Sequence, residues 1–280
     1  MADAQAKPKK GSLRPDIGTL GGILVAMLGI VGGLILEGGE ISDISQLTAG
    51  LIVLGGTFGA VLINTPLATV TGATKGLMHV FFEQGVSPDG VVEEIIRYAT
   101  RARKAGIVSL EDEVSRASDP FLVKALTLAV DGADLQELRK MMELEISQQE
   151  HHGESEARVF EVAGGYAPTI GIIGAVLGLI QVMKNLSDID KVGHGIAVSF
   201  VATVYGVALA NIFLLPAANK MKARTQQDSH MREMMLEGVI GIVEGLNPKL
   251  IRSKLEAYVP PKKEKKDKPE APAPRPEAGE

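Results

Sequence analysis

The most regular feature of the sequence is the alternation of long apolar stretches with charged ones. Four stretches of 20 to 28 residues contain no Asp, Glu, Lys or Arg: 17–36, 47–67, 162–183 and 192–219. At about 1.5 Å of rise per residue, roughly 20 helical residues cross the ~30 Å hydrocarbon core of a bilayer. The pattern therefore predicts an all-α membrane protein with four transmembrane helices, in the segments 17–67 and 162–219.

The segment 68–161 is too polar to lie in a membrane and too long for a loop, so we expect it to fold as a helical domain. Ser87-Pro88 and Asp119-Pro120 each supply an N-cap followed by proline at the first helical position. Apolar residues follow each pair at helical spacing until Gly106 and Gly132. Two amphipathic helices are predicted there.

A third, longer helix is predicted to begin at Asp134, which precedes Glu137 as in a capping box. No proline occurs before Pro168, so this helix is expected to continue into the third apolar stretch. The segment 220–259 is again amphipathic and is predicted to pack against the first polar segment as a C-terminal helix. From residue 260 to 280, proline and charged residues predominate, which predicts a disordered tail.

Lys and Arg flank one side of the predicted helices. They occur within 1–16, at Lys75 after the second stretch, and at Lys220, Lys222 and Arg224 after the fourth. By the positive-inside rule, both termini and the segments 68–161 and 220–259 are expected in the cytoplasm. The connections after the first and third stretches are short and are expected outside.

Composition excludes several classes of protein. The chain has no cysteine, which removes disulfides, thiol nucleophiles and thiolate metal sites, and its net charge is only −5. Its basic clusters lack interleaved aromatic residues, so nucleic acid is not an expected partner. His151-His152 with Glu154 and Glu156 do not converge as metal ligands, because neighbouring helical residues point about 100° apart. We expect no enzyme activity, no cofactor and no metal.

The apolar stretches lack the carboxylate that ion pathways through bilayers generally use, and His194 lies near the outer end of the fourth. If the chain conducts ions, another subunit supplies that carboxylate. Pro168 and Pro216 interrupt the last two stretches, either as simple kinks or at the inner mouth of a pathway. Glycine pairs at four-residue spacing favour close helix packing, within or between chains: Gly18/Gly22, Gly29/Gly33, Gly55/Gly59 and Gly174/Gly178.

Three segments carry a resemblance to a known family: 164–179 (GGYAPTIGIIGAVLGL), 202–211 (ATVYGVALAN) running to Pro216, and 103–111 (RKAGIVSLE). They resemble the A subunit of the bacterial flagellar motor stator, the MotA/PomA family of the MotA/TolQ/ExbB superfamily, over nearly the whole chain. The resemblance implies an inner-membrane subunit that conducts ions and drives the flagellar rotor. It also implies a homopentamer around two B subunits, each with one membrane helix, an essential aspartate and a peptidoglycan-binding domain.

The resemblance also assigns roles to individual positions. An ion pathway is implied at Pro168, Ala175, Ala202, Thr203, Tyr205 and Pro216, with Pro168 and Thr203 near the partner aspartate. Arg103 and Glu111 are implied to face the rotor switch-complex ring. Some members carry an acid where this chain has Gly165, so its role is not transferred. Sodium-type members tend to have threonine at the positions of Ala175 and Ala202. A hard cation needs several oxygens to replace its water, so protons are the expected ion.

Two other classes of protein compete with the stator. A Tol/Ton-type energiser of the same superfamily shares the ion-conducting core but usually has three membrane helices. A secondary transporter usually has polar midplane groups or inverted repeats, whereas here the first two apolar stretches do not resemble the last two. Four predicted membrane helices favour the stator.

Overall fold

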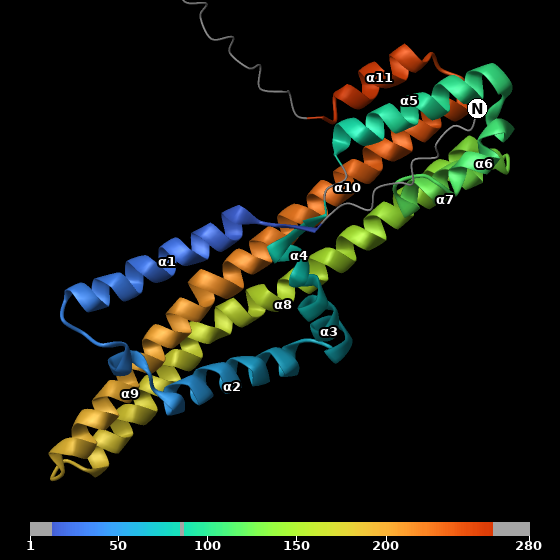
Figure 1. Ribbon diagram of the computed structural model, residues 1–280. Helices are drawn as coiled ribbons and strands as arrows, with labels where there is room; N and C mark the ends of the chain where they lie inside the picture. The colour runs from blue at the N-terminus through green and yellow to red at the C-terminus, as the bar shows by residue number, and fades with distance from the viewer. Residues whose placement is uncertain (1–12, 85–86, 260–280) are drawn as a thin grey trace, which may run out of the picture.

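The computed structural model describes residues 13–84 and 87–259 and is dominated by helices (Figure 1). Within this part of the chain, four helical segments are long and apolar enough to cross a membrane: Ile17–Leu36, Ile41–Asn64, Leu135–Lys184 and Ile189–Val243. The predicted all-α membrane class with four spans is thereby confirmed. The predicted tail at 260–280 and most of the N-terminal segment 1–16 lie outside the described residues.

The first two apolar stretches form helices with different surroundings. Helix α1 (Ile17–Leu36) has no buried residue and stands apart from the other long helices (Figure 1). A short 3-10 helix, η1 (Ile41–Ile44), leads into α2 (Leu47–Asn64). Helix α2 buries a single stripe at four-residue spacing: Ala49, Val53, Thr57 and Val61. It therefore packs on the bundle through one face.

The second span ends earlier than its charge-free stretch. Helix α2 stops at Asn64 because Pro66 cannot continue it, and Pro66 caps a new helix, α3 (Leu67–Gly76). The chain continues through α4 (Met78–Phe81) into strand β2 (Phe82–Gln84). Strand β2 pairs antiparallel with β1 (Leu13–Pro15), a small sheet that the sequence analysis did not predict.

The next helices begin where their capping signals predicted. Ser87 caps α5 (Pro88–Ala105), with its Oγ accepting from the Gly90 N–H at 3.2 Å. Beyond Gly106 follow η2 (Ile107–Leu110) and α6 (Glu111–Val114). Asp119 caps α7 (Pro120–Val130) by accepting from the Phe121 N–H at 2.7 Å. The predicted amphipathic helices are confirmed.

Two very long antiparallel helical segments run through the molecule. Helix α8 (Leu135–Lys184) has 50 residues, about 75 Å by the usual rise, and continues into the third apolar stretch as predicted. Pro168 lies within this continuous helix. Helix α9 (Ile189–Ala208) continues through a π-helical segment, η3 (Leu209–Leu214), into α10 (Leu215–Val243). The short α11 (Pro248–Glu256) then folds back beside α5 (Figure 1).

The main apolar core lies at the end of the molecule far from the α8–α9 turn. It joins α5, α7, the start of α8, the end of α10 and α11. Its largest fully buried members include Ile95, Leu122, Leu126, Met142, Met234, Met235, Ile240 and Leu255. The prediction that the second polar segment packs against the first is confirmed.

Candidate functional site

Helices α8 and α9 touch through their backbones. A Cβ atom added to Gly206 would lie 2.5 Å from the Ala167 carbonyl oxygen, and one added to Gly171 would lie 2.8 Å from the Ala202 carbonyl oxygen. Further out, a Cβ on Gly178 would lie 2.7 Å from the Gly195 carbonyl oxygen. Small residues permit such close approach of membrane helices. The seam between α8 and α9 therefore has no room for an ion, and any pathway must run along its surface.

The positions assigned to the ion pathway are distributed unevenly about this seam. Ala202 is fully buried inside it, where its Cβ would be 2.7 Å from a Cβ on Gly174. Ala175 and Thr203 are partly exposed at its edge, and the Thr203 hydroxyl donates to the Ser199 carbonyl oxygen at 3.2 Å. Pro168 is half-buried in α8. Ala175 and Thr203 are therefore accessible from outside the seam, whereas Ala202 is not.

Tyr205 connects α9 to the segment that leads into α2. Its hydroxyl donates to the Ile44 carbonyl oxygen at 2.5 Å and accepts from the Gln46 N–H at 3.3 Å. The bond fixes the start of α2 against α9. This contact assigns Tyr205 a structural role that its spacing in the sequence did not reveal.

Pro216 follows a local change of helix type. The π-helical segment Leu209–Leu214 ends two residues before it, and Pro216 itself is exposed. Single π-turns are rare in helices and recur at functional sites, and a proline removes one backbone hydrogen bond. In contrast to Pro168, which lies within continuous α-helix, Pro216 marks a place where the backbone of its span is irregular.

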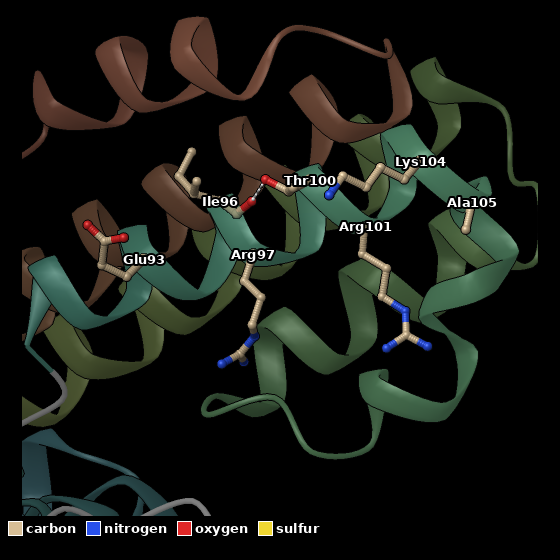
Figure 2. A pocket seen from close by; sticks show the side chains of 7 residues that line it. All are labelled: Glu93, Ile96, Arg97, Thr100, Arg101, Lys104 and Ala105. Atoms are coloured by element: carbon tan, nitrogen blue, oxygen red, sulfur yellow. Dashed lines mark hydrogen bonds between the residues drawn. The ribbon is translucent and has the colours of Figure 1, made fainter. Parts of the chain in front are cut away.

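Arg103 and Glu111 are both exposed, and they belong to α5 and α6, which lie at the end of the molecule far from the α8–α9 turn (Figure 1). Arg103 is in the last turn of α5, and Glu111 begins α6 after the Gly106 turn. Arg97, Arg101 and Lys104 line a separate open groove of 540 Å³ along α5 (Figure 2). Their i, i+4, i+7 spacing could have identified this basic face of α5, which the sequence analysis missed.

A buried carboxylate holds α5 in place behind these charges. Glu94, only 9% exposed, accepts from the Tyr98 hydroxyl at 2.8 Å and from the Ser118 hydroxyl and N–H at 2.5 and 3.1 Å. Burial, and then the neighbouring Glu94 carboxylate, raises the pKa of Tyr98 to about 12. The phenol therefore stays protonated and keeps donating to Glu94 at neutral pH, and the bonds from Ser118 to the same carboxylate tie α5 to the connection before α7.

A charged cluster holds the start of α1 to α10. Asp16 caps α1 by accepting from the Thr19 N–H at 2.9 Å, and its other carboxylate oxygen lies 2.5 Å from Lys220 Nζ and 2.8 Å from an Arg224 nitrogen. Hydrogen bonding to Lys220, followed by the Thr19 N–H, holds the pKa of Asp16 well below its usual range. No local pattern predicted this contact, because its residues lie some 200 positions apart in the sequence.

No group of three or more His, Cys, Asp or Glu side chains within 13–84 and 87–259 is placed to hold a metal ion. His152 lies 3.2 Å from Glu156 on the same helix and is largely exposed. The four long apolar helical segments and the close-packed α8–α9 seam define a helical membrane protein.

Comparisons with known proteins identify the family. Residues 113–259 match the model of the MotA/TolQ/ExbB proton channel family, and residues 20–105 match that of the motility protein A N-terminal region. The chain belongs to this family and is a stator subunit within it, as the resemblance implied. The N-terminal match separates it from the Tol/Ton-type energisers considered above.

Relatives and solved structures agree over most of the chain. Motility protein A of Bacillus subtilis is 35% identical over 251 residues, covering 88% of this chain and 92% of the relative. Chemotaxis protein PomA of Vibrio alginolyticus is 31% identical, with 84% and 95% covered. The structure of C. jejuni MotAB has a TM-score of 0.84 and 31% identity, covering 91% of this chain and 98% of the other. The protein is thus a bacterial inner-membrane protein.

Proposed function

We propose that this chain forms an ion channel with a B subunit and converts the ion flow into torque on the flagellar rotor. The observation that carries the proposal is the lack of Asp and Glu in the stretches 17–36, 47–67, 162–183 and 192–219 of a member of a proton channel family. The titrating carboxylate must then come from a partner helix. Two of the similar solved structures are MotAB complexes, which supports a B subunit as that partner. The proposal includes no enzymatic step.

The proposed assembly is a homopentamer of this chain around the B helices. The homopentamer is supported by the large apolar surface that a single chain leaves exposed, because such a surface must be covered by a neighbouring subunit or by lipid. Helix α1 buries no residue. Helices α8 and α9 also expose large apolar side chains: Ile172, Ile173, Val176, Leu177, Phe200, Val204 and Val207.

The proposed ion is the proton. Ala175 and Ala202 carry only methyl groups, so Thr203 alone of these three positions offers a side-chain oxygen. Sodium must exchange much of its hydration shell for protein oxygens, whereas a proton needs the carboxylate and at most a water. Ala175 is the position that tests this choice, because a threonine at the buried Ala202 would also disturb the α8–α9 seam.

Ion flux in liposomes tests the proposal. We expect no proton flux with this chain alone and measurable flux once the B subunit is present. Each charge that crosses releases about 2.3 kcal/mol per 100 mV, several times thermal energy and sufficient for a mechanical step. The measurement is the quenching of a pH-sensitive dye after a potential is applied.

The control for this experiment is the complex in which the membrane aspartate of the B subunit is replaced by asparagine. Replacing sodium by potassium in the medium should leave the flux of the intact complex unchanged. Flux from the A subunit alone would contradict the proposal, and sodium dependence would overturn only the ion assignment.

The proposed topology places both termini and the segments 68–161 and 220–259 in the cytoplasm. It can be tested without background because the chain has no cysteine. A cysteine at the exposed Ser42 should react in whole cells with an impermeant maleimide, and one at the exposed Ser115 should react only after lysis. The opposite labelling pattern would invert the topology.

Arg103 and Glu111 are proposed to contact the rotor ring from the cytoplasmic domain. This proposal is supported by the exposure of both side chains at the end of the domain furthest from the spans. The Glu94 contacts described above hold α5 in position there. Counting from residue 162 back to 135, α8 extends the domain about 40 Å beyond the membrane. That reach brings the charges clear of the lipid surface.

A further inference from the structure

One buried serine joins the two helices of the α8–α9 seam. Ser199 of α9 is only 6% exposed, and its hydroxyl donates to the Ala175 carbonyl oxygen of α8 at 2.8 Å. The same hydroxyl lies 3.0 Å from the Gly195 carbonyl oxygen of its own helix. A serine hydroxyl has one proton, so the two carbonyl oxygens share it. Ser199 is therefore bonded both across the seam and along its own helix.

The close approach of α8 makes this bond possible. A Cβ atom added to Gly178 would overlap the Ser199 Oγ and would lie 2.9 Å from the Ser199 backbone nitrogen. The glycine contacts of the seam bring the two backbones together, but they are packing contacts without a preferred direction. A hydrogen bond weakens steeply when its length or angle changes. The Ser199 bond therefore limits how far α9 can slide along α8.

Ser199 also contacts a second position of the proposed pathway. The Thr203 hydroxyl, one turn further along α9, donates to the Ser199 carbonyl oxygen at 3.2 Å. Because its proton is used in this bond, the Thr203 oxygen keeps lone pairs that can accept from a donor outside the seam. Ala175 and Thr203 lie on different helices, and both are partly exposed at the edge of the seam. Ser199 connects the two.

We propose that Ser199 is a positioning residue of the ion pathway, whose hydroxyl holds Thr203 of α9 at the depth of Ala175 on α8. The inference rests on the proposed function, in which a partner helix brings its carboxylate to this edge of the seam. A protonated carboxyl group can donate a hydrogen bond and a carboxylate cannot, so a correctly placed Thr203 oxygen favours the proton-loaded form. Ser199 itself does not contact the ion and acts through Thr203.

Removing the Ser199 hydroxyl tests the proposal. In the A–B complex in liposomes, Ser199→Ala deletes the bond to Ala175 and leaves the backbone carbonyl that Thr203 contacts. We expect proton flux per assembled complex to fall about fivefold at alkaline pH, the factor that one net hydrogen bond is worth. The loss should shrink as the pH falls, because the carboxyl group is then protonated without this help. The pH of half-maximal flux should move down by about 0.7 unit, which is the same factor.

Thr57→Val is the matched control. Thr57 of α2 is 4% exposed, and its hydroxyl has no hydrogen-bond partner among the described residues. This change also removes one buried hydroxyl from a membrane helix, but no bond is lost with it. Its flux should therefore follow that of the unmodified complex at every pH. Thr203→Val should reproduce the pH pattern of Ser199→Ala, because both changes act on the same oxygen.

The outcomes separate this inference from the proposed function. The inference is overturned if Ser199→Ala conducts like Thr57→Val, if it loses the same fraction of flux at every pH, or if Thr203→Val does not share its pH pattern. Failure of Ser199→Ala to assemble with the B subunit would also overturn it, since the serine would then serve the fold alone. Absence of flux from the unmodified complex would instead contradict the proposed function.

Discussion

Replacing Gly206 by alanine is expected to cost about 3 kcal/mol of stability and to abolish assembly of the membrane bundle. The added methyl would lie 2.5 Å from the Ala167 carbonyl oxygen and 3.2 Å from its carbon. These are backbone atoms of α8, so no side chain can rotate away to make room. The helices must separate, and the contacts between Gly171 and α9 are lost with them. The measurement is the thermal unfolding midpoint of the purified chain in detergent.

Gly55→Ala is the matched control for this change. It adds the same methyl in a membrane helix, and no heavy atom lies within 4 Å of the new Cβ. Its midpoint should stay close to that of the unmodified chain. Equal midpoints for the two alanine variants would show that the α8–α9 seam is not as close as described.

The glycines show what the sequence predicted and what it did not. Four-residue spacing selected four glycine pairs. A Cβ added to any glycine of Gly29/Gly33 or Gly55/Gly59, however, would have no heavy atom of another helix within 4 Å in this chain. Gly174/Gly178 does pack within the chain, against Ala202 and Ser199. The tightest contact to backbone, at Gly206, belonged to none of the selected pairs. Spacing identifies small residues on one helix face, whereas contact depends on which helix lies opposite.

Local signals predicted the helices well because their causes are local. Caps at Ser87, Asp119 and Asp134 are set by residues two or three positions away, and each is present. The end of α2 before Pro66 could also have been predicted, since a proline cannot continue a helix. It was missed because the predicted span was defined by its lack of charged residues, which extends past Pro66. The small β1–β2 sheet depends on pairing between residues some 70 positions apart and had no such signal.

The candidate site was predicted less completely for the same reason. The resemblance assigned Ala175, Ala202 and Thr203 to one pathway, yet only the first and last are exposed enough for a partner to reach. Whether a helical residue faces its neighbour or the outside follows from the rotation of the helix in the bundle. That rotation is fixed by the α8–α9 seam, which the sequence does not show directly.

Asp16→Asn is expected to loosen α1 from α10 and to destabilise the chain by about 1–2 kcal/mol at neutral pH. Helix α1 buries no residue, so the contacts at its N-terminal end carry much of its attachment. These contacts include the ion pairs of Asp16 with Lys220 and Arg224, in which the Asp16 side chain is only 13% exposed. The Asp16 N–H also donates to the Phe81 carbonyl oxygen at 2.9 Å. Asparagine keeps the cap on Thr19 but removes the charge.

The pH dependence of the unfolding midpoint shows whether Asp16→Asn destabilises the chain by removing the charge or by changing the shape of the side chain. The pKa of Asp16 lies below its ordinary value of 3.8 in the folded chain, so its ion pairs stabilise the fold above that pH and the stabilisation is lost as the pH falls below about 4. The gap in unfolding midpoint between the unmodified chain and Asp16→Asn should be constant from about pH 7 to 5 and should close on further acidification. Asp188→Asn, which keeps the cap of α9 but removes a charge paired with nearby Lys191, is the control and should leave α1 in place. A gap that persisted unchanged in acid would mean that α1 is held by shape rather than by the Asp16 carboxylate.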